Sequence, residues 1–383
     1  MRGQAQVAGG AGGRRHGWPT AAPTTSDGTM LDRIKTGVDA FLTSYASKLQ
    51  GELAGFAERL SDFTSYPFFV TPAHRLHWFY LFAFLIVALV VYLHGKRAAE
   101  GSSLRGFLEF WLPKSIYRHR STLLDLKFYV VNGVFVEVAF VSALIGSFTV
   151  FAEAFEAALL LLWSAPAAAS EVTLPIRIAY VSAIFLAADF GFFFGHYLGH
   201  KVPFLWEFHK VHHTAEVLNP LTNYRFHPLD RILLGLCIGI TTGVVKGAFG
   251  FAFPGGISEI ALINISVLVL FNLTANLRHS HVWLSYGWHL SHVFSSPAQH
   301  QIHHGTAPRH IDKNFGLMLS LWDWLAGSLY VPREREDIEL GLTGGEHAEY
   351  DSLWRLYTRP LVKAGALLIG RAQPARAESL PRS

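Results

Sequence analysis

Histidine clusters are the feature of this sequence best suited to chemistry. His196 and His200 lie four residues apart, and two H-x-x-H-H motifs follow further along the chain. The eight histidines of these motifs are His196, His200, His209, His212, His213, His300, His303 and His304. On a helix, residues three or four apart share a face, so each motif can aim at least two imidazoles in the same direction. Such sets of imidazoles indicate metal binding.

The composition leaves histidine as the main candidate ligand. The chain has 20 histidines and 1 cysteine, Cys237, which excludes a multi-thiolate zinc site and an intramolecular disulfide. One zinc takes about four ligands, so eight clustered histidines indicate two metal ions, or one ion plus structural residues. The count favours a dinuclear centre. Imidazole suits iron, zinc, copper and nickel alike, so the ligand type alone does not select the metal.

The chain as a whole is too apolar for an ordinary soluble enzyme. Of its 383 residues, 51% are hydrophobic, and the net charge of +4 on scattered basic residues argues against nucleic-acid binding. Residues 151–163 are expected to form only a re-entrant or interfacial helix. Apolar segments that approach the length of a bilayer span lie at 78–93, 128–150, 178–195, 232–250 and 257–275. These segments predict an all-α, polytopic membrane protein.

The charge distribution predicts the orientation of these spans. The loop 96–127 carries more Lys and Arg than Asp and Glu, so the positive-inside rule predicts that it is cytoplasmic. Counting spans alternately from this loop brings both histidine clusters to the cytoplasmic face, where they would form a helical metal-binding cap. A metal transporter would instead carry its histidines near mid-membrane on several spans.

Composition divides the chain into four predicted segments. Residues 1–30 are rich in Gly, Ala, Thr and Arg, and are expected to be a disordered leader or an upstream start before Met30. Residues 31–75 have apolar positions at helical spacing, which suits an amphipathic interfacial segment or, equally, a packed pair of soluble helices. The membrane-embedded domain is expected at 76–332, followed by a partly ordered cytoplasmic tail at 333–383.

Four stretches around the histidines carry a family resemblance. They read DFGFFFGHYLGH, WEFHKVHHTAEVLNPLTNYRFHP, SPAQHQIHHG and NFGLMLSLWDWLAGSLY. Over roughly residues 115–332, this combination resembles the fatty acid hydroxylase and sterol desaturase superfamily. The resemblance implies a non-haem di-iron membrane enzyme that uses O2 to hydroxylate or desaturate a lipid C–H bond. Sterol, fatty acyl, sphingoid and carotenoid substrates all remain open.

The resemblance also implies roles for single residues. The eight clustered histidines would bind iron, and a ninth ligand would come from LRHSHV, where His279 is preferred over His281. His227 in the FHP stretch is a less certain ligand, or a donor to a ligand. Asp189 would orient a ligand by accepting the other N–H of its ring. Its alternative is a buried helix-capping or salt-bridged carboxylate. Tyr197 departs from the family, in which arginine often follows the first histidine.

The implied cofactors are two iron ions, with O2 as co-substrate, and the implied substrate is a lipid that enters from the bilayer. A separate electron donor of ferredoxin or cytochrome type is expected. One cysteine cannot hold an iron–sulfur cluster, and the sequence has no glycine motif for a flavin or nicotinamide. Trp322, Asp323 and Trp324 resemble the closing WD element of the family and are interpreted as a structural interfacial helix. The alternative function is a catalytically silent membrane protein that retains the fold.

Overall fold

The computed structural model describes residues 39, 43, 76–95, 103–163, 172–254, 257 and 275–370, and for 133–139 and 141 the helical backbone alone. The chain divides into two compact units, Met1–Ala46 and Ser47–Ser383. In the first unit, the Thr43 hydroxyl donates a hydrogen bond to the Asp39 carbonyl at 2.8 Å. Four predictions lie outside the described residues, wholly or in large part: the leader 1–30, the segment 31–75, the span 257–275 and the tail end 371–383.

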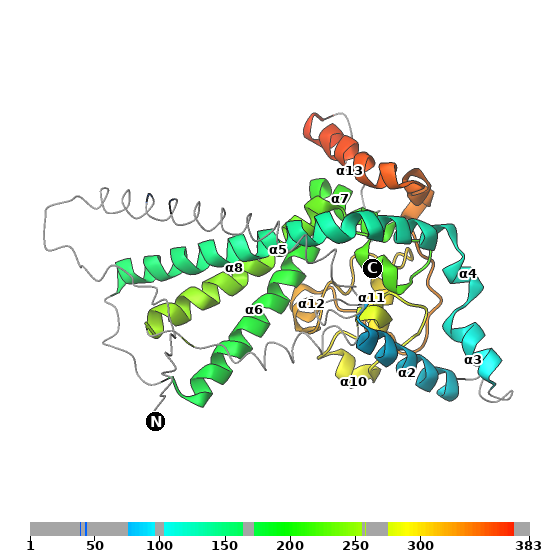
Figure 1. The fold of residues 1–383 in the computed structure, drawn as a ribbon, viewed down its shortest axis with the longest axis horizontal. Helices are drawn as coiled ribbons and strands as arrows, with labels where there is room; N and C mark the ends of the chain where they lie inside the picture. The colour runs from blue at the N-terminus through cyan, green and yellow to red at the C-terminus, as the bar shows by residue number, and fades with distance from the viewer. Residues whose placement is uncertain are drawn as a thin grey trace, which may run out of the picture. The chain divides into compact units, whose positions relative to one another are not determined.

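The regular secondary structure in the described part of the second unit is entirely helical, which confirms the predicted all-α fold class. These residues contain no β-strand and only two isolated bridges, Phe294 with Leu319 and Gly305 with Leu340. Figure 1 labels the α-helices. Their bounds are α2 Trp78–His94, α3 Leu104–Trp111, α4 Lys114–Tyr117, α5 Arg120–Leu162, α6 Leu174–Lys201, α7 Pro203–His213, α8 Pro228–Ala252, α10 Gly287–Ser291, α11 Pro297–His303, α12 Leu321–Ala326 and α13 Leu353–Leu368. Two 3-10 helices, η2 Pro220–Tyr224 and η3 Thr343–Tyr350, complete the set.

Three of these helices are long and apolar enough to cross a bilayer. They are Ser142–Leu162, which is the second half of α5, and the whole of α6 and α8. Together with the apolar composition, they support an integral membrane protein. The prediction of a separate interfacial helix at 151–163 is wrong, because α5 continues without a break from Arg120 to Leu162.

The first predicted span, which forms α2, is shorter than the three candidate spans described above. Helix α2 has 17 residues, including the exposed apolar side chains of Trp78, Phe82 and Ile86. About 20 residues are needed to cross the hydrocarbon core without distortion of the bilayer. A crossing by α2, and with it the cytoplasmic side of the histidines, therefore stays a prediction.

Helix α8 packs between α5 and α6 (Figure 1). It approaches α5 through a glycine stripe, Gly235, Gly239, Gly243 and Gly247, which recurs every four residues and therefore follows one face. A methyl group added at Gly239 would lie 2.4 Å from the carbonyl oxygen of Leu144. This distance is far inside van der Waals contact, so the two backbones touch directly. Small residues at such a face are typical of helix pairs in membranes.

Gly239→Ala is expected to destabilise the folded protein by about 1–3 kcal/mol, because the added methyl group must push the α5 backbone away. Gly365→Ala in α13 is the matched control, since nothing lies within 4 Å of its methyl position. The control should be neutral or stabilising by up to about 1 kcal/mol, the intrinsic helix preference of alanine. Thermal unfolding in detergent measures both variants. Equal midpoints would contradict the close α5–α8 contact.

Residues beyond the family resemblance pack against the histidine-bearing helix α7. Tyr350 and Leu356 form an apolar cluster with Val211 of α7 and Phe128 of α5. A buried ion network reinforces this contact. Lys210 of α7 lies 2.6 Å from Glu207 and 2.8 Å from Glu346 of η3. The part of the predicted tail that precedes residue 371 therefore supports the helix that carries His209, His212 and His213.

Candidate metal centre

The end of α6 and the start of α7 set the first five histidines. Val202 precedes Pro203, and a residue before proline avoids the helical conformation, so α6 ends at Lys201 and α7 starts at Pro203 in a new direction. A methyl group at Gly199 would lie 3.2 Å from Cγ of His209. The glycine therefore lets this imidazole lie against α6, beside the histidines of that helix.

The structure brings nine predicted histidines together in two groups. Within each group, the candidate ligand nitrogens all lie within 4.8 Å of one another. The five-histidine group consists of His196, His200, His209, His213 and His303, and the four-histidine group of His212, His279, His300 and His304. One centre thus combines side chains from α6, α7, α11 and the turn at His279. The first and last of these histidines, His196 and His304, are 108 residues apart in the sequence.

Hydrogen bonds from outside orient the rings of the five-histidine group. His196 Nδ1 donates to the Phe315 carbonyl at 2.8 Å, and His303 Nδ1 donates to the Lys313 carbonyl at 2.7 Å. His209 Nδ1 donates to the buried Asp230 carboxylate at 3.1 Å. These bonds place the proton on Nδ1 and leave the Nε2 lone pair directed into the group.

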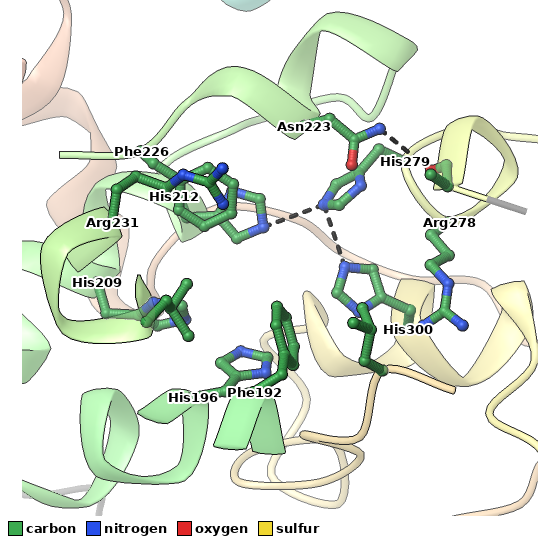
Figure 2. Close-up of a pocket in the computed structure, with 13 residues that line it drawn as sticks. Phe192, His196, His209, His212, Asn223, Phe226, Arg231, Arg278, His279 and His300 are labelled. Carbon is green, nitrogen blue, oxygen red and sulfur yellow. Dashed lines mark hydrogen bonds between the residues drawn. The ribbon is translucent and has the colours of Figure 1, made fainter. Parts of the chain in front are cut away.

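The four-histidine group has a geometry that fits a metal ion. The Nε2 atom of His279 lies 3.0 Å from that of His212, 3.1 Å from that of His300 and 3.2 Å from that of His304. Figure 2 shows the first two of these contacts as dashed lines. Nitrogens about 2.1 Å from a tetrahedral ion would lie about 3.4 Å apart. The donor atoms are thus already close to the spacing that one ion requires.

Burial keeps five of these imidazoles neutral and ready to bind a cation. It lowers the pKa of His303 to about 3, and burial together with neighbouring histidines holds the pKa values of His212, His213, His300 and His304 well below 6.5. The Nε2 atoms of His196, His200 and His303 are buried and have no hydrogen-bond partner among the described residues. Polar atoms in this state are costly unless something pairs with them. A metal ion in each group would provide the partner.

Asp189 does not have the predicted role. Its carboxylate accepts hydrogen bonds from the backbone N–H groups of Met318 at 2.9 Å and Leu319 at 3.1 Å, and from the Trp322 indole at 2.9 Å. No histidine is among these partners, so the prediction that Asp189 accepts a ligand N–H is wrong. The carboxylate is buried, as its alternative predicted, but it binds the backbone of residues 318 and 319, which precede α12, and caps no helix.

Asp230 is a buried carboxylate that does bind a grouped histidine, and the sequence did not reveal it. It lies in the first turn of α8, and its side chain is almost fully buried against His209. The available signal was an acidic residue at the start of a largely apolar helix, three positions after His227. Such a residue is expected near a helix N-terminus in any case, so the pattern alone did not indicate a metal site.

Two less certain candidates lie outside both groups. His281 Nε2 donates to the Phe110 carbonyl at 2.7 Å, and its ring packs edge-on against the Phe110 ring. His227 caps α8 by accepting the Leu229 backbone N–H, and its Nε2 donates to the Tyr357 carbonyl. Both imidazoles therefore have structural partners. Between His279 and His281, the structure brings only His279 to the candidate ligands.

A pocket borders both groups and is lined on its other sides mainly by apolar side chains (Figure 2). His196 and His209 of the five-histidine group face it, as do three members of the other group. Phe192 of α6, Leu234 of α8 and Leu317 supply apolar walls. Of the phenylalanines in DFGFFFG, Phe192 thus reaches the pocket. Asn223, Arg231 and Arg278 add polar groups to the lining, so the pocket combines apolar and polar walls beside the imidazoles.

Comparisons with known proteins agree with this geometry. The profile of the fatty acid hydroxylase family matches residues 181–328. Alkylglycerol monooxygenase of Xenopus tropicalis is 28% identical over 160 residues, which are 42% of this chain and 32% of that protein. Ornithine lipid hydroxylase OlsE of Rhizobium tropici is 28% identical over 157 residues, or 41% and 44% of the two chains. Delta(7)-sterol 5(6)-desaturase of Eremothecium gossypii is 30% identical over 163 residues, or 41% and 39%.

The similarity covers only part of each protein. The chain matches less than half the length of these curated relatives. No solved structure matches the chain. All nine grouped histidines lie inside the residues that the family profile covers. Residues 181–328, which include both histidine groups, thus match the fatty acid hydroxylase family, and the relatives support a place in the fatty acid hydroxylase and sterol desaturase superfamily.

Proposed function

We propose that this protein uses O2 to oxidise a C–H bond of a membrane lipid, as a hydroxylase or a desaturase. The observation that carries the proposal is the pair of buried histidine groups with their unpaired ring nitrogens. The relatives are named as a lipid monooxygenase, a lipid hydroxylase and a sterol desaturase, and these names support lipid C–H oxidation. Sterol, fatty acyl, sphingoid and carotenoid lipids are the candidate substrates.

The donor set fits two iron ions. One ion would be held by His196, His200, His209, His213 and His303, and the other by His212, His279, His300 and His304. Neutral imidazoles suit iron, although they also suit zinc and copper, so the choice of iron rests on the family. Iron held in this way supplies the O2 activation that attack on an unactivated C–H bond requires.

The chain's own residues bind and orient the reactants. Phe192, Leu234 and Leu317 would hold the lipid's hydrocarbon part in the pocket beside both histidine groups. Holding a C–H bond close to the metal ions removes much of the entropic cost of the reaction. The Nδ1 hydrogen bonds to Phe315, Lys313 and Asp230 keep the ligand rings in place during turnover.

The proposal also covers the source of electrons and the side of the membrane from which they arrive. A hydroxylation consumes two electrons besides those of the C–H bond, and we propose a separate ferredoxin or cytochrome as their source. The donor would approach from the cytoplasm. Residues 103–127, which precede the candidate span in α5, carry an excess of basic side chains. By the positive-inside rule, this excess favours the cytoplasmic side for the segment.

Metal content is the first test. Detergent-purified protein that is grown with iron is expected to hold about two irons per chain, one for each histidine group. His303→Ala should lower this content sharply, whereas His289→Ala, an exposed histidine outside both groups, should not. Lipid products with an added electron donor are then analysed by mass spectrometry. Two irons without any oxidised lipid would favour the silent protein, and absence of iron would reject the di-iron centre.

A further inference from the structure

The segment 313–319 lies between α6 and α11 and contacts a histidine on each side. The Lys313 carbonyl accepts from His303 of α11, and the Phe315 carbonyl accepts from His196 of α6, at 2.7 and 2.8 Å. Both histidines belong to the five-histidine group. The Nδ1 proton that each carbonyl binds fixes the tautomer, so that Nε2 is the free donor atom in both rings. The backbone of this segment therefore decides where two of the five ligand nitrogens point.

Two buried carboxylates hold the segment from its outer side. Asp323 of α12 accepts the backbone N–H groups of Phe315 at 2.8 Å and Gly316 at 2.7 Å. The Ser328 hydroxyl donates to the same carboxylate at 2.6 Å. Asp189 of α6 accepts the next backbone N–H groups, those of Met318 and Leu319. Together, the two carboxylates bind four N–H groups within five residues.

The backbone of the segment is built for this close approach. A methyl group at Gly316 would lie 2.8 Å from Asp323 Oδ2 and 2.6 Å from the Leu319 carbonyl, so only glycine fits. Asn314 adopts a left-handed φ of 58°, and its amide donates to the Gln299 carbonyl of α11 at 3.1 Å. A left-handed conformation at a residue other than glycine carries strain, which the surrounding bonds must maintain.

Three rings of the five-histidine group have this external support, whereas His212 of the four-histidine group lacks it at Nδ1 within the described part of the chain. In the five-histidine group, His196, His209 and His303 each bind an acceptor outside the group through Nδ1. In the four-histidine group, the Nε2 atoms contact one another, and His212 Nδ1 is buried without a hydrogen-bond partner among the described residues. A ligand held from outside loses less freedom when it binds a metal, and an outside acceptor also makes the imidazole more basic.

We infer that Asp189 and Asp323 are positioning residues that act on the five-histidine group through the backbone carbonyls of Lys313 and Phe315. The five-histidine group therefore holds its metal ion more firmly than the four-histidine group. This inference rests on the metal binding that the proposed function includes, but it does not depend on the substrate or on turnover. It also gives a shared task to Asp189 and Asp323, which lie near the two ends of the residues that the family profile matches.

Metal release tests the inference. The full-length protein in detergent is loaded with Fe(II), and release to a chromogenic iron chelator is followed with time. Wild type should release its iron in two phases of similar size, and the slow phase should survive in His279→Ala because that variant lacks only a ligand of the four-histidine group. Asp323→Asn should speed the slow phase by about 10–100-fold and leave the fast phase unchanged. The new amide would point an N–H group at a backbone N–H group.

Asp337→Asn makes the same chemical change at an exposed position and should release iron as wild type does. Ser328→Ala removes one donor to Asp323 without changing the carboxylate, so a smaller acceleration of the slow phase is expected even if Asp323→Asn fails to fold. A general loss of structure would instead speed both phases together, and that result would overturn the inference. A single phase in wild type would also overturn it. Two phases without lipid oxidation would leave the inference standing and reject the proposed function alone.

Discussion

Replacing His279 with alanine is expected to lower the iron content from about two ions to about one per chain and to reduce lipid oxidation by more than about 100-fold. His279 is the centre of the four-histidine group, since its Nε2 atom lies within 3.2 Å of the Nε2 atoms of the other three members. Loss of this nitrogen leaves three donors in place. The remaining ion in the five-histidine group should stay bound but should not support turnover.

His281→Ala is the matched control for His279→Ala, because the two histidines are two residues apart in the same LRHSHV stretch. It removes a hydrogen bond to the Phe110 carbonyl and a ring contact, which costs about 1 kcal/mol of stability. Iron content and lipid oxidation should stay close to wild type. Iron analysis and product assay on both variants check this. Loss of iron in His281→Ala but not in His279→Ala would reverse the assignment of the ninth ligand.

The histidine groups could be predicted from the sequence because local spacing contains most of the information. His196 and His200, and likewise His209 and His213, are four residues apart, and a helix places such residues on the same face. The ninth ligand, which lies outside these motifs in the sequence, was harder to choose. The preference for His279 over His281 came from the family resemblance, and the fold supports it because only His279 lies with the other candidate ligands.

The role of Asp189 could not be predicted in the same way. Its partners, Met318, Leu319 and Trp322, lie about 130 residues further along the chain, and nothing near Asp189 indicates them. Because Asp189 and His196 are seven residues apart on one helix, the sequence suggested that the carboxylate orients a ligand imidazole. In the fold, the carboxylate and the imidazole do contact the same segment, but at different points of its backbone.

The split of α5 into two predicted pieces has a clear physical cause. Glu153 and Glu156 interrupt the apolar run, and charged residues normally mark the end of a span. In the fold, Glu156 lies against α8, with Lys246 as a nearby positive charge and its carboxylate next to the space left open by Gly250. A partner helix thus compensates the charge, which hydropathy along a single segment cannot show. The glycine stripe of α8 was missed for the same reason.

Asp230→Asn is expected to weaken iron binding at the five-histidine group by about 10–100-fold. The carboxylate lies 3.1 Å from His209 Nδ1, and both side chains are almost fully buried. A negative acceptor makes His209 a stronger donor to a cation and fixes its tautomer, whereas a neutral amide oxygen provides a weaker bond. Equilibrium competition for Fe(II) against a chelator measures the loss, which should be confined to the tighter of the two sites.

Asp351→Asn provides the matched control, because this exposed carboxylate pairs with Arg355 on the surface and touches no grouped histidine. Its iron affinity should equal that of wild type. Asp230 also lies in the first turn of α8, where loss of a negative charge costs about 0.3–1 kcal/mol of helix stability. This small cost should lower the unfolding temperature slightly in both metal-loaded and metal-free protein. A change in thermal stability with unchanged iron affinity would make Asp230 a helix-capping residue and leave His209 without a functional acceptor.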